Sequence, residues 1–359
     1  MRSVALKKIL SLLPLLVLLG LAFGYLYFEN HKPLVSPFAG IFDDGTGKVS
    51  QKVAKPLRLD FAKSIELESL KNIPRYIVYN ADTGEVYHAK NSSEFMSPAS
   101  FTKLLSTQVV LDLVAIDQVI TATPESIDKV PTVLGLKTDE KLSVSELLRG
   151  AIATSANDAA QTLADGAASF NKLDRKDFTR LMNTKARLIG MSHSQFTNPD
   201  GLDDEAQFTT LEDLALLANN VSANYPEISS AAGTDRQDIE KTEDHDRYYL
   251  PNWNGLLGVY PGVDGLKIAY TENAGYSTMV TAKAEDKRFV VIVSGADSYL
   301  ERDRAAADLL DAAHIAEKMS PKKINRWTLS KRYQEWADLA NKIKAELEAT
   351  KSESKNSTN

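Results

Sequence analysis

The sequence contains no cysteine in its 359 residues. Disulfides, thiolate nucleophiles and cysteine-ligated zinc or iron–sulfur sites are therefore excluded, and any covalent catalysis must use oxygen or amine groups. A surplus of positive charge is also lacking, because 42 basic residues stand against 48 acidic ones and the formal net charge is -6. Without a dominant basic surface to neutralise a phosphate backbone, nucleic acid is not expected as a partner.

Histidine is scarce, with five residues in the whole chain. They stand at positions 31, 88, 193, 245 and 314, away from every motif described below. Neither a Ser-His-Asp triad nor a histidine metal site is indicated, so we expect no metal or organic cofactor. The hydrophobic content of 43% is ordinary for a globular protein and is enough for one large domain with additional segments.

The first thirty residues carry a localisation signal. Arg2, Lys7 and Lys8 precede an uncharged run over residues 9–28, which as a helix would measure about 30 Å and match a bilayer core. The positive flank should stay cytoplasmic, and no small-x-small cleavage site ends the run. We therefore predict a signal anchor over residues 1–29, a single pass through the cell membrane, and the rest of the chain on the extracytoplasmic side. A cleaved signal peptide is the alternative, and it also places the rest of the chain on the extracytoplasmic side.

Composition divides the rest of the chain into three parts. Residues 30–72 are broken by proline and glycine and read as a linker, residues 73–318 form one domain, and residues 319–359 form an amphipathic helix with a polar tail. The domain shows helical periodicity over 102–120, 145–168 and 178–189, a hairpin pattern over 76–88, and strand patterns over 276–282 and 288–294. Strands that bracket helices predict an α+β domain and not a βαβ repeat.

The C-terminal helix has an apolar stripe from Leu329 to Leu347 that includes Tyr333 and Trp336. We expect the stripe to pack on the domain, since most amphipathic stripes are buried against their own chain. The flanking lysines and arginines leave contact with a membrane interface as the alternative.

Ser100 and Lys103 stand three residues apart at the start of a helical pattern. This spacing places both on one helix face, where a partly desolvated lysine can take the proton of a serine hydroxyl. Ser100 is thus the candidate nucleophile and Lys103 its base. A serine three residues before a lysine is common by chance, so the companion motifs must decide.

Two further motifs follow in order. Ser155 and Asn157 lie inside an apolar helical stretch, where buried polar groups need partners. They are either helix caps or, as we favour, a proton relay to the leaving amine (Ser155) and a ligand of substrate and lysine (Asn157). Lys267 comes just before the strand pair.

These three motifs resemble the S-x-x-K, serine-to-asparagine and K-T-G signature of penicillin-binding proteins and related β-lactamases. The similarity is close to the low-molecular-mass D-alanyl-D-alanine carboxypeptidases. It extends over about residues 73–315, through runs such as Phe196-Thr197-Asn198-Pro199-Asp200-Gly201 and Asn252-Trp253-Asn254-Gly255. It implies a β-lactamase/transpeptidase-like fold, with an antiparallel sheet flanked by helices and a mostly helical subdomain.

The resemblance also implies an activity. Ser100 would form an acyl-enzyme on peptidoglycan stem peptides ending in D-Ala-D-Ala, with β-lactam antibiotics as covalent inhibitors. The backbone N–H groups of Ser100 and Tyr270 would form the oxyanion hole. A class A β-lactamase is disfavoured, because no E-x-x-L-N pattern lies between Asn157 and Lys267.

One departure from the family pattern concerns the third motif, which reads Lys267-Ile268-Ala269 where the family has threonine and glycine after the lysine. In the family the threonine helps to hold the terminal carboxylate of the substrate, and isoleucine has no hydrogen-bond donor there. The flanking Tyr270 and Thr271 keep the register and are candidate substrate-binding residues. The alternative function is therefore a pseudoenzyme that binds or scaffolds peptidoglycan with little turnover.

Arg302 stands where the family has an arginine near the carboxylate site. It is the remaining candidate for binding the substrate carboxylate. A solvated charge within its charged surroundings is the other interpretation.

Overall fold

The computed structural model describes residues 55–60 and 62–356, with side chains described up to residue 346. The predicted signal anchor and the linker up to residue 54 lie outside the described residues. Among the helices that are described, none combines the length and the apolar character that a membrane span requires.

The centre of the fold is a five-stranded antiparallel sheet in the order β2-β1-β9-β8-β7. Its strands are β1 (Arg75–Asn80), β2 (Val86–Lys90), β7 (Val263–Ala269), β8 (Tyr276–Ala284) and β9 (Lys287–Ala296). The hairpins β1–β2 and β8–β9 confirm the strand pairs predicted from alternation. The first turn is closed by Asn80, whose Oδ1 accepts from the backbone N–H groups of Asp82 and Thr83.

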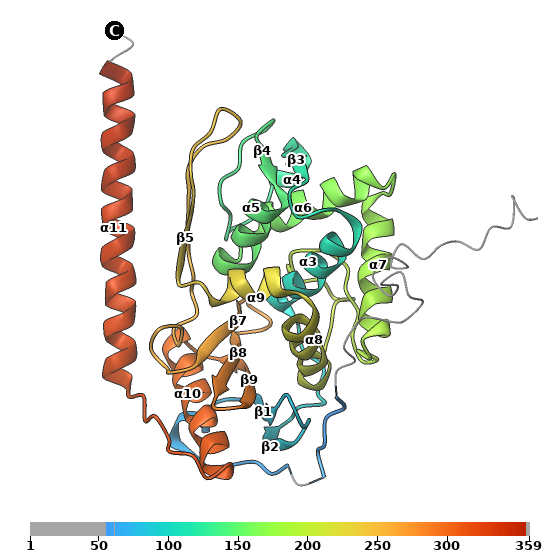
Figure 1. Ribbon diagram of the computed structural model, residues 1–359, viewed down its shortest axis with the longest axis vertical. Coiled ribbons are helices and arrows are strands. Elements are labelled where there is room, and N and C mark those ends of the chain that lie inside the picture. Colours follow the sequence, from blue (N-terminus) through green and yellow to red (C-terminus); the bar gives the residue numbers. More distant parts are fainter. Residues whose placement is uncertain (1–54, 61, 357–359) are drawn as a thin grey trace, which may run out of the picture. The chain divides into compact units, whose positions relative to one another are not determined.

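Both faces of the sheet are covered (Figure 1). Side chains alternate along β1, so that Ile77 and Tyr79 join one core while Tyr76 and Val78 join the other. The first core is shared with the helices between β2 and β7, and the second with α10 (Tyr299–Ala316). The result is the α+β arrangement expected from the sequence.

Most of the described α-helices lie between β2 and β7. Its helices are α3 (Thr102–Leu113), α4 (Pro124–Ile127), α5 (Val144–Arg149), α6 (Asn157–Phe170), α7 (Arg175–Leu188), α8 (Leu211–Asn224) and α9 (Pro226–Gly233). Two small hairpins accompany them, β3 (Val119–Thr121) with β4 (Lys141–Ser143), and β5 (Arg236–Ile239) with β6 (Tyr248–Pro251).

Two helices differ from the sequence prediction. The helix predicted over 102–120 ends at Leu113, because Val114 is extended (φ -142°, ψ 154°) and the β-branched residues that follow pair as β3. The helix predicted over 145–168 is interrupted after a π-helical turn, Gly150–Thr154, because Ser155 adopts a left-handed conformation (φ 66°, ψ 30°). The interruption falls at the second motif.

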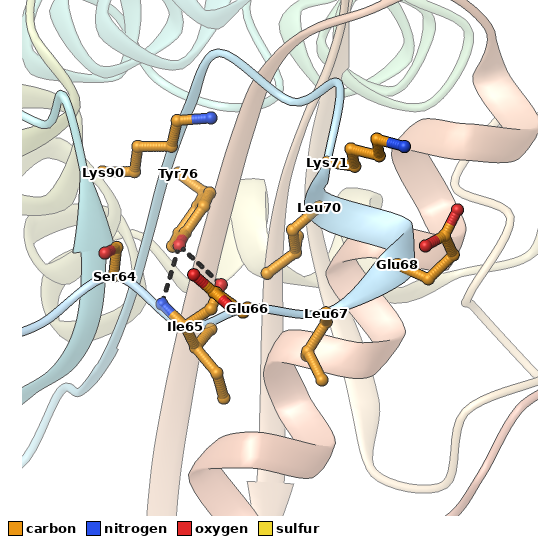
Figure 2. A pocket seen from close by; sticks show the side chains of 9 residues that line it. All are labelled: Ser64, Ile65, Glu66, Leu67, Glu68, Leu70, Lys71, Tyr76 and Lys90. Atoms are coloured by element: carbon orange, nitrogen blue, oxygen red, sulfur yellow. Dashed lines mark hydrogen bonds between the residues drawn. The ribbon is translucent and has the colours of Figure 1, made fainter.

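The described part of the predicted linker lies against the domain. Figure 2 shows the Tyr76 hydroxyl of β1 bonded to both backbone groups of Ile65, beside a hollow of about 520 Å³. Ser69 Oγ donates to Asp308 Oδ2 at 2.6 Å, and Leu70 is buried in the second core. Packing on the sheet therefore begins before residue 73, the predicted start of the domain.

The long C-terminal helix α11 spans Arg326–Asn356. Leu329, at the start of the predicted apolar stripe, is fully buried in the core that α10 and the sheet share. Tyr333 packs partly buried against the same core. The N-terminal part of the stripe thus contacts the domain.

Candidate active site

Ser100 lies in a short 3-10 turn, Ala99–Phe101, from which α3 begins. Ala99 has a left-handed φ of 45°, a strained conformation for a residue with a side chain. Lys103 follows one turn later on the same helix face. Its Nζ lies 3.1 Å from Ser100 Oγ. The structure therefore brings together the nucleophile and base predicted from their spacing.

The Lys103 side chain is completely buried but has three polar partners. Its Nζ donates to Asn157 Oδ1 at 2.7 Å and to the Asp200 carbonyl at 2.5 Å, and its third contact is Ser100 Oγ. Burial lowers the pKa of Lys103 to about 8, while the Asp200 carboxylate opposes the shift and the Lys129 charge adds to it. A neutral amine has two N–H donors for the two oxygens, which leaves its lone pair facing the serine hydroxyl.

The second motif borders the same lysine. Ser155 and Asn157 are both buried, at the break between the π-helical turn and α6. Asn157 Nδ2 donates to the Val130 carbonyl at 2.9 Å, so the amide is held with its oxygen toward Lys103. The asparagine therefore does contact the lysine, as predicted.

A loop that sequence reasoning did not assign a role completes the lysine site. Gly201 has a φ of 84°, and a Cβ there would lie 1.8 Å from the Ala99 carbonyl oxygen. This close approach lets the loop deliver the Asp200 carbonyl to Lys103. The Asp200 carboxylate lies 2.9 Å from Lys129 Nζ. The Asn-Pro-Asp-Gly run signals a tight turn in the sequence, but no local pattern shows which carbonyl would face the lysine.

Lys267 precedes the β8–β9 pair in the chain, as expected, and lies on a strand of its own, β7, which is one of the two edges of the sheet. Its side chain is buried, and its Nζ donates to the Ile268 carbonyl at 3.1 Å. Burial holds the pKa of Lys267 well below its ordinary value, and the charges of Lys103 and Arg302 lower it further. Repulsion from Lys103 indicates that the two lysines share one electrostatic environment.

Tyr270 and Thr271 follow β7. The Tyr270 side chain is half exposed, and its ring centroid lies 4.5 Å from that of Tyr276. The Thr271 hydroxyl donates to Asp203 Oδ1 at 2.8 Å and accepts from the Ala274 N–H. In this structure the threonine hydroxyl therefore organises the turn after β7.

Arg302 is on α10 and is only 3% exposed, so it is not a solvated surface charge. Its guanidinium makes two hydrogen bonds to the carboxylate of Asp303, at 2.7 and 2.9 Å. Asp303 is itself fully buried and accepts a third bond from the Tyr333 hydroxyl of α11 at 2.5 Å. The positive charge of Arg302 is thus compensated within the protein, a pairing that adjacent positions in the sequence did not predict.

The arrangement places a serine hydroxyl in contact with a buried lysine amine, between a helical region and the edge of an antiparallel sheet. The same fold occurs in solved penicillin-binding proteins. The sequence profile of the D-alanyl-D-alanine carboxypeptidase family matches residues 69–298. The chain belongs to this family.

Individual relatives agree with this assignment. The chain is 31% identical over 247 residues to the D-alanyl-D-alanine carboxypeptidase DacF of Bacillus subtilis, covering 66% of this chain and 61% of the relative. It is 31% identical over 233 residues to DacC of Escherichia coli, covering 62% and 56%. The chain therefore spans about three fifths of the length of the curated relatives it matches.

Solved structures give the same result for the fold. The carboxypeptidase DacD from Francisella tularensis superposes with a TM-score of 0.63 at 27% identity, over 74% of this chain and 73% of that chain. Penicillin-binding protein D2 from Listeria monocytogenes with bound cefotaxime gives 0.59 at 28% identity, over 70% and 99%.

Proposed function

We propose that this chain is a serine-type D-alanyl-D-alanine carboxypeptidase that acts on peptidoglycan stem peptides. The observation that carries the proposal is the contact of Lys103 Nζ with Ser100 Oγ, 3.1 Å, in surroundings that bring the lysine pKa to about 8. A lysine with this pKa is partly neutral near physiological pH and can accept the serine proton.

In the first step Ser100 Oγ attacks the carbonyl carbon of the penultimate D-alanine, while its proton passes to Lys103. The backbone N–H groups of Ser100 and Tyr270 stabilise the oxyanion. The peptide C–N bond then breaks, and the amine of the terminal residue takes a proton through Ser155. In the second step water attacks the ester carbonyl while one of its protons passes to Lys103. The ester C–O bond then breaks, and Lys103 returns that proton to Ser100 Oγ.

The substrate side of the proposal draws on the relatives. Several are named D-alanyl-D-alanine carboxypeptidases, and the Listeria protein was solved with cefotaxime and with ampicillin bound. We propose that β-lactams acylate Ser100 in the same way. Asn157 and the β7 edge, from Lys267 to Tyr270, would bind the peptide backbone, since an edge strand can pair with an extended peptide.

The pseudoenzyme alternative is not favoured. Its motivation was the Ile268 and Ala269 substitution, which affects carboxylate binding and leaves the nucleophile and base untouched. Ser100, Lys103 and Asn157 are joined by hydrogen bonds. This arrangement is harder to explain as a retained fold than the two strand substitutions are as drift.

The test is the Ser100→Ala variant with a fluorescent penicillin. We expect complete loss of covalent labelling with an unchanged circular dichroism spectrum, because among the described serines only the Ser100 hydroxyl is hydrogen-bonded to the Lys103 amine. The matched control, Ser93→Ala, removes an exposed hydroxyl a few residues earlier and should label like the parent protein. Labelling of the folded Ser100→Ala protein would disprove the assignment of the nucleophile.

A further inference from the structure

A cavity of about 400 Å³ lies between the end of β7, the strand that carries Lys267, and the C-terminal helix α11. Ile268 and Tyr270 line it from β7 and the turn after it, and Tyr333 and Trp336 line it from α11. The cavity therefore begins one residue after Lys267 and includes the residue whose backbone N–H belongs to the proposed oxyanion hole. Ile268, which stands at the position of the family threonine, is therefore part of its lining.

The walls of this cavity are mainly aromatic. They include six aromatic side chains, Trp253, Tyr270, Tyr276, Tyr299, Tyr333 and Trp336. The rings support one another across elements: Tyr299 and Tyr333 meet edge-on at 4.6 Å, and Trp253 and Trp336 at 5.4 Å. Tyr270 and Tyr299 remain about half exposed. Exposed aromatic groups around a concave apolar surface are typical of a binding site for an apolar group.

The same place offers fewer hydrogen-bond donors to a substrate carboxylate than the family pattern does. Ile268 offers no hydrogen bond to a carboxylate, and the guanidinium of Arg302 is occupied by Asp303. The Tyr333 hydroxyl holds Asp303 in that position. For a leaving residue bound here, an apolar side chain would contribute more binding free energy than the carboxylate.

From this geometry we infer that the cavity is a subsite for the side chain of the leaving residue, and that it takes a large apolar or aromatic D-amino acid in preference to D-alanine. The inference rests on the proposed carboxypeptidase function. A methyl group would leave most of the cavity unfilled, so the lining would lose its contacts. A benzyl group occupies more of it and can stack on the Tyr333 and Trp336 rings.

The experiment compares two N-acetylated tripeptides that end in D-Ala-D-Ala and D-Ala-D-Phe, with the full chain and the released amino acid as the readout. We expect kcat/KM for the D-Phe peptide to exceed that for the D-Ala peptide by about tenfold or more, the range that hydrophobic pockets achieve. Trp336→Ala should collapse this ratio toward one, chiefly by raising KM for the D-Phe peptide.

The matched control is Trp327→Ala. Trp327 is on the same helix, is 73% exposed, and does not line the cavity. This variant should keep the preference of the parent protein.

A reciprocal variant restores the family residues, Ile268→Thr with Ala269→Gly. Regaining one hydrogen bond to a charged group corresponds to roughly ten- to a hundredfold in rate. We expect kcat/KM for the D-Ala peptide to rise by about that factor and the preference for D-Phe to shrink. Unchanged or lower turnover of the D-Ala peptide by the folded double variant would contradict this.

The outcomes separate the inference from the proposed function. If both peptides are cleaved equally, or if Trp336→Ala keeps the D-Phe preference, the subsite is disproved and the carboxypeptidase function stands. If neither peptide is cleaved and Ser100 is not labelled by penicillin, both are disproved.

Discussion

Lys103 is buried as completely as the leucines that follow it on α3, yet its amine is the centre of the proposed chemistry. Desolvation disfavours the charged form, and the carboxylates of Asp200 and Asp158 only partly offset this effect. Asn157 and the Asp200 carbonyl orient the amine without adding a charge through these contacts. The residue is therefore suited to accept a proton and then return it.

The pKa of Lys103 predicts the pH dependence of acylation. The neutral amine is the active form, and the pKa is lowered to about 8. The labelling rate with fluorescent penicillin should therefore rise about tenfold per pH unit below pH 8 and level off above it. A rate measured from pH 6 to 10 that shows no acidic limb near pH 8 would contradict the assignment of Lys103 as the base.

Removing the Lys129 charge should shift the pH dependence in a known direction. This charge lowers the pKa of Lys103 directly, and it also pairs with the opposing Asp200 carboxylate. Both effects have the same sign, so Lys129→Gln should move the acidic limb to higher pH. The control is Lys141→Gln, which removes an exposed lysine of β4 that pairs with Asp244. It should leave the acidic limb in place.

At the scale of elements, the second motif depends on a broken helix. A continuous helix from residue 145 to 168 would carry Ser155 and Asn157 around the helix axis at 100° per residue. The π-helical turn and the left-handed Ser155 instead end one helix and begin α6 at Asn157. The Asp158 carboxylate then accepts the N–H groups of Leu134, Gly135 and Leu136, which fixes the loop in front of the break.

Helix α11 gives a stability prediction. Ending the chain at Pro321 removes Leu329, which is fully buried, together with the Tyr333 bond to Asp303. Losing one buried leucine costs about 1.5–3 kcal/mol, which corresponds to a drop in Tm of about 3–6 °C for a domain of this size. Differential scanning calorimetry would measure this change.

The control for α11 ends the chain at residue 346 and should change Tm little, because it keeps Leu329 and Tyr333, which pack in the core of the domain. An unchanged Tm after truncation at Pro321, together with Trp336-dependent binding to anionic liposomes, would instead support the membrane interpretation of the stripe.

For the whole molecule, we propose that residues 1–29 hold the protein at the outer side of the cell membrane. The proposal is supported by the uncharged run of bilayer length after a positive flank. Deleting residues 1–29 should move the protein from the membrane fraction to the soluble fraction after cell lysis, with penicillin labelling retained. The anchor is refuted if the shortened chain stays in the membrane fraction. It is also refuted if the parent chain is found in the soluble fraction.

Much of this protein could be read from the sequence. Ser100 and Lys103 are neighbours on one helix turn, so their contact depends only on local geometry. Alternation also predicted the β1–β2 and β8–β9 hairpins, because their pairing strands are close in the chain. The end of α3 at Leu113 was missed, since apolar residues at helical spacing continue into β3 and only their pairing with β4 decides between helix and strand.

Tertiary structure decided what depends on distant segments. The Asp200 carbonyl meets Lys103 across 97 residues, and Asn157 meets it across 54. The bond from the Tyr333 hydroxyl to Asp303 and the aromatic cavity beside Ile268 arise only when α10, α11 and β7 come together. Side-chain spacing determines which groups share a helix or strand face, but desolvation and charge pairing depend on every element packed around a group. The sequence by itself therefore determined the family and the candidate pair Ser100 and Lys103, and the tertiary structure decided the surroundings of that pair and of Ile268.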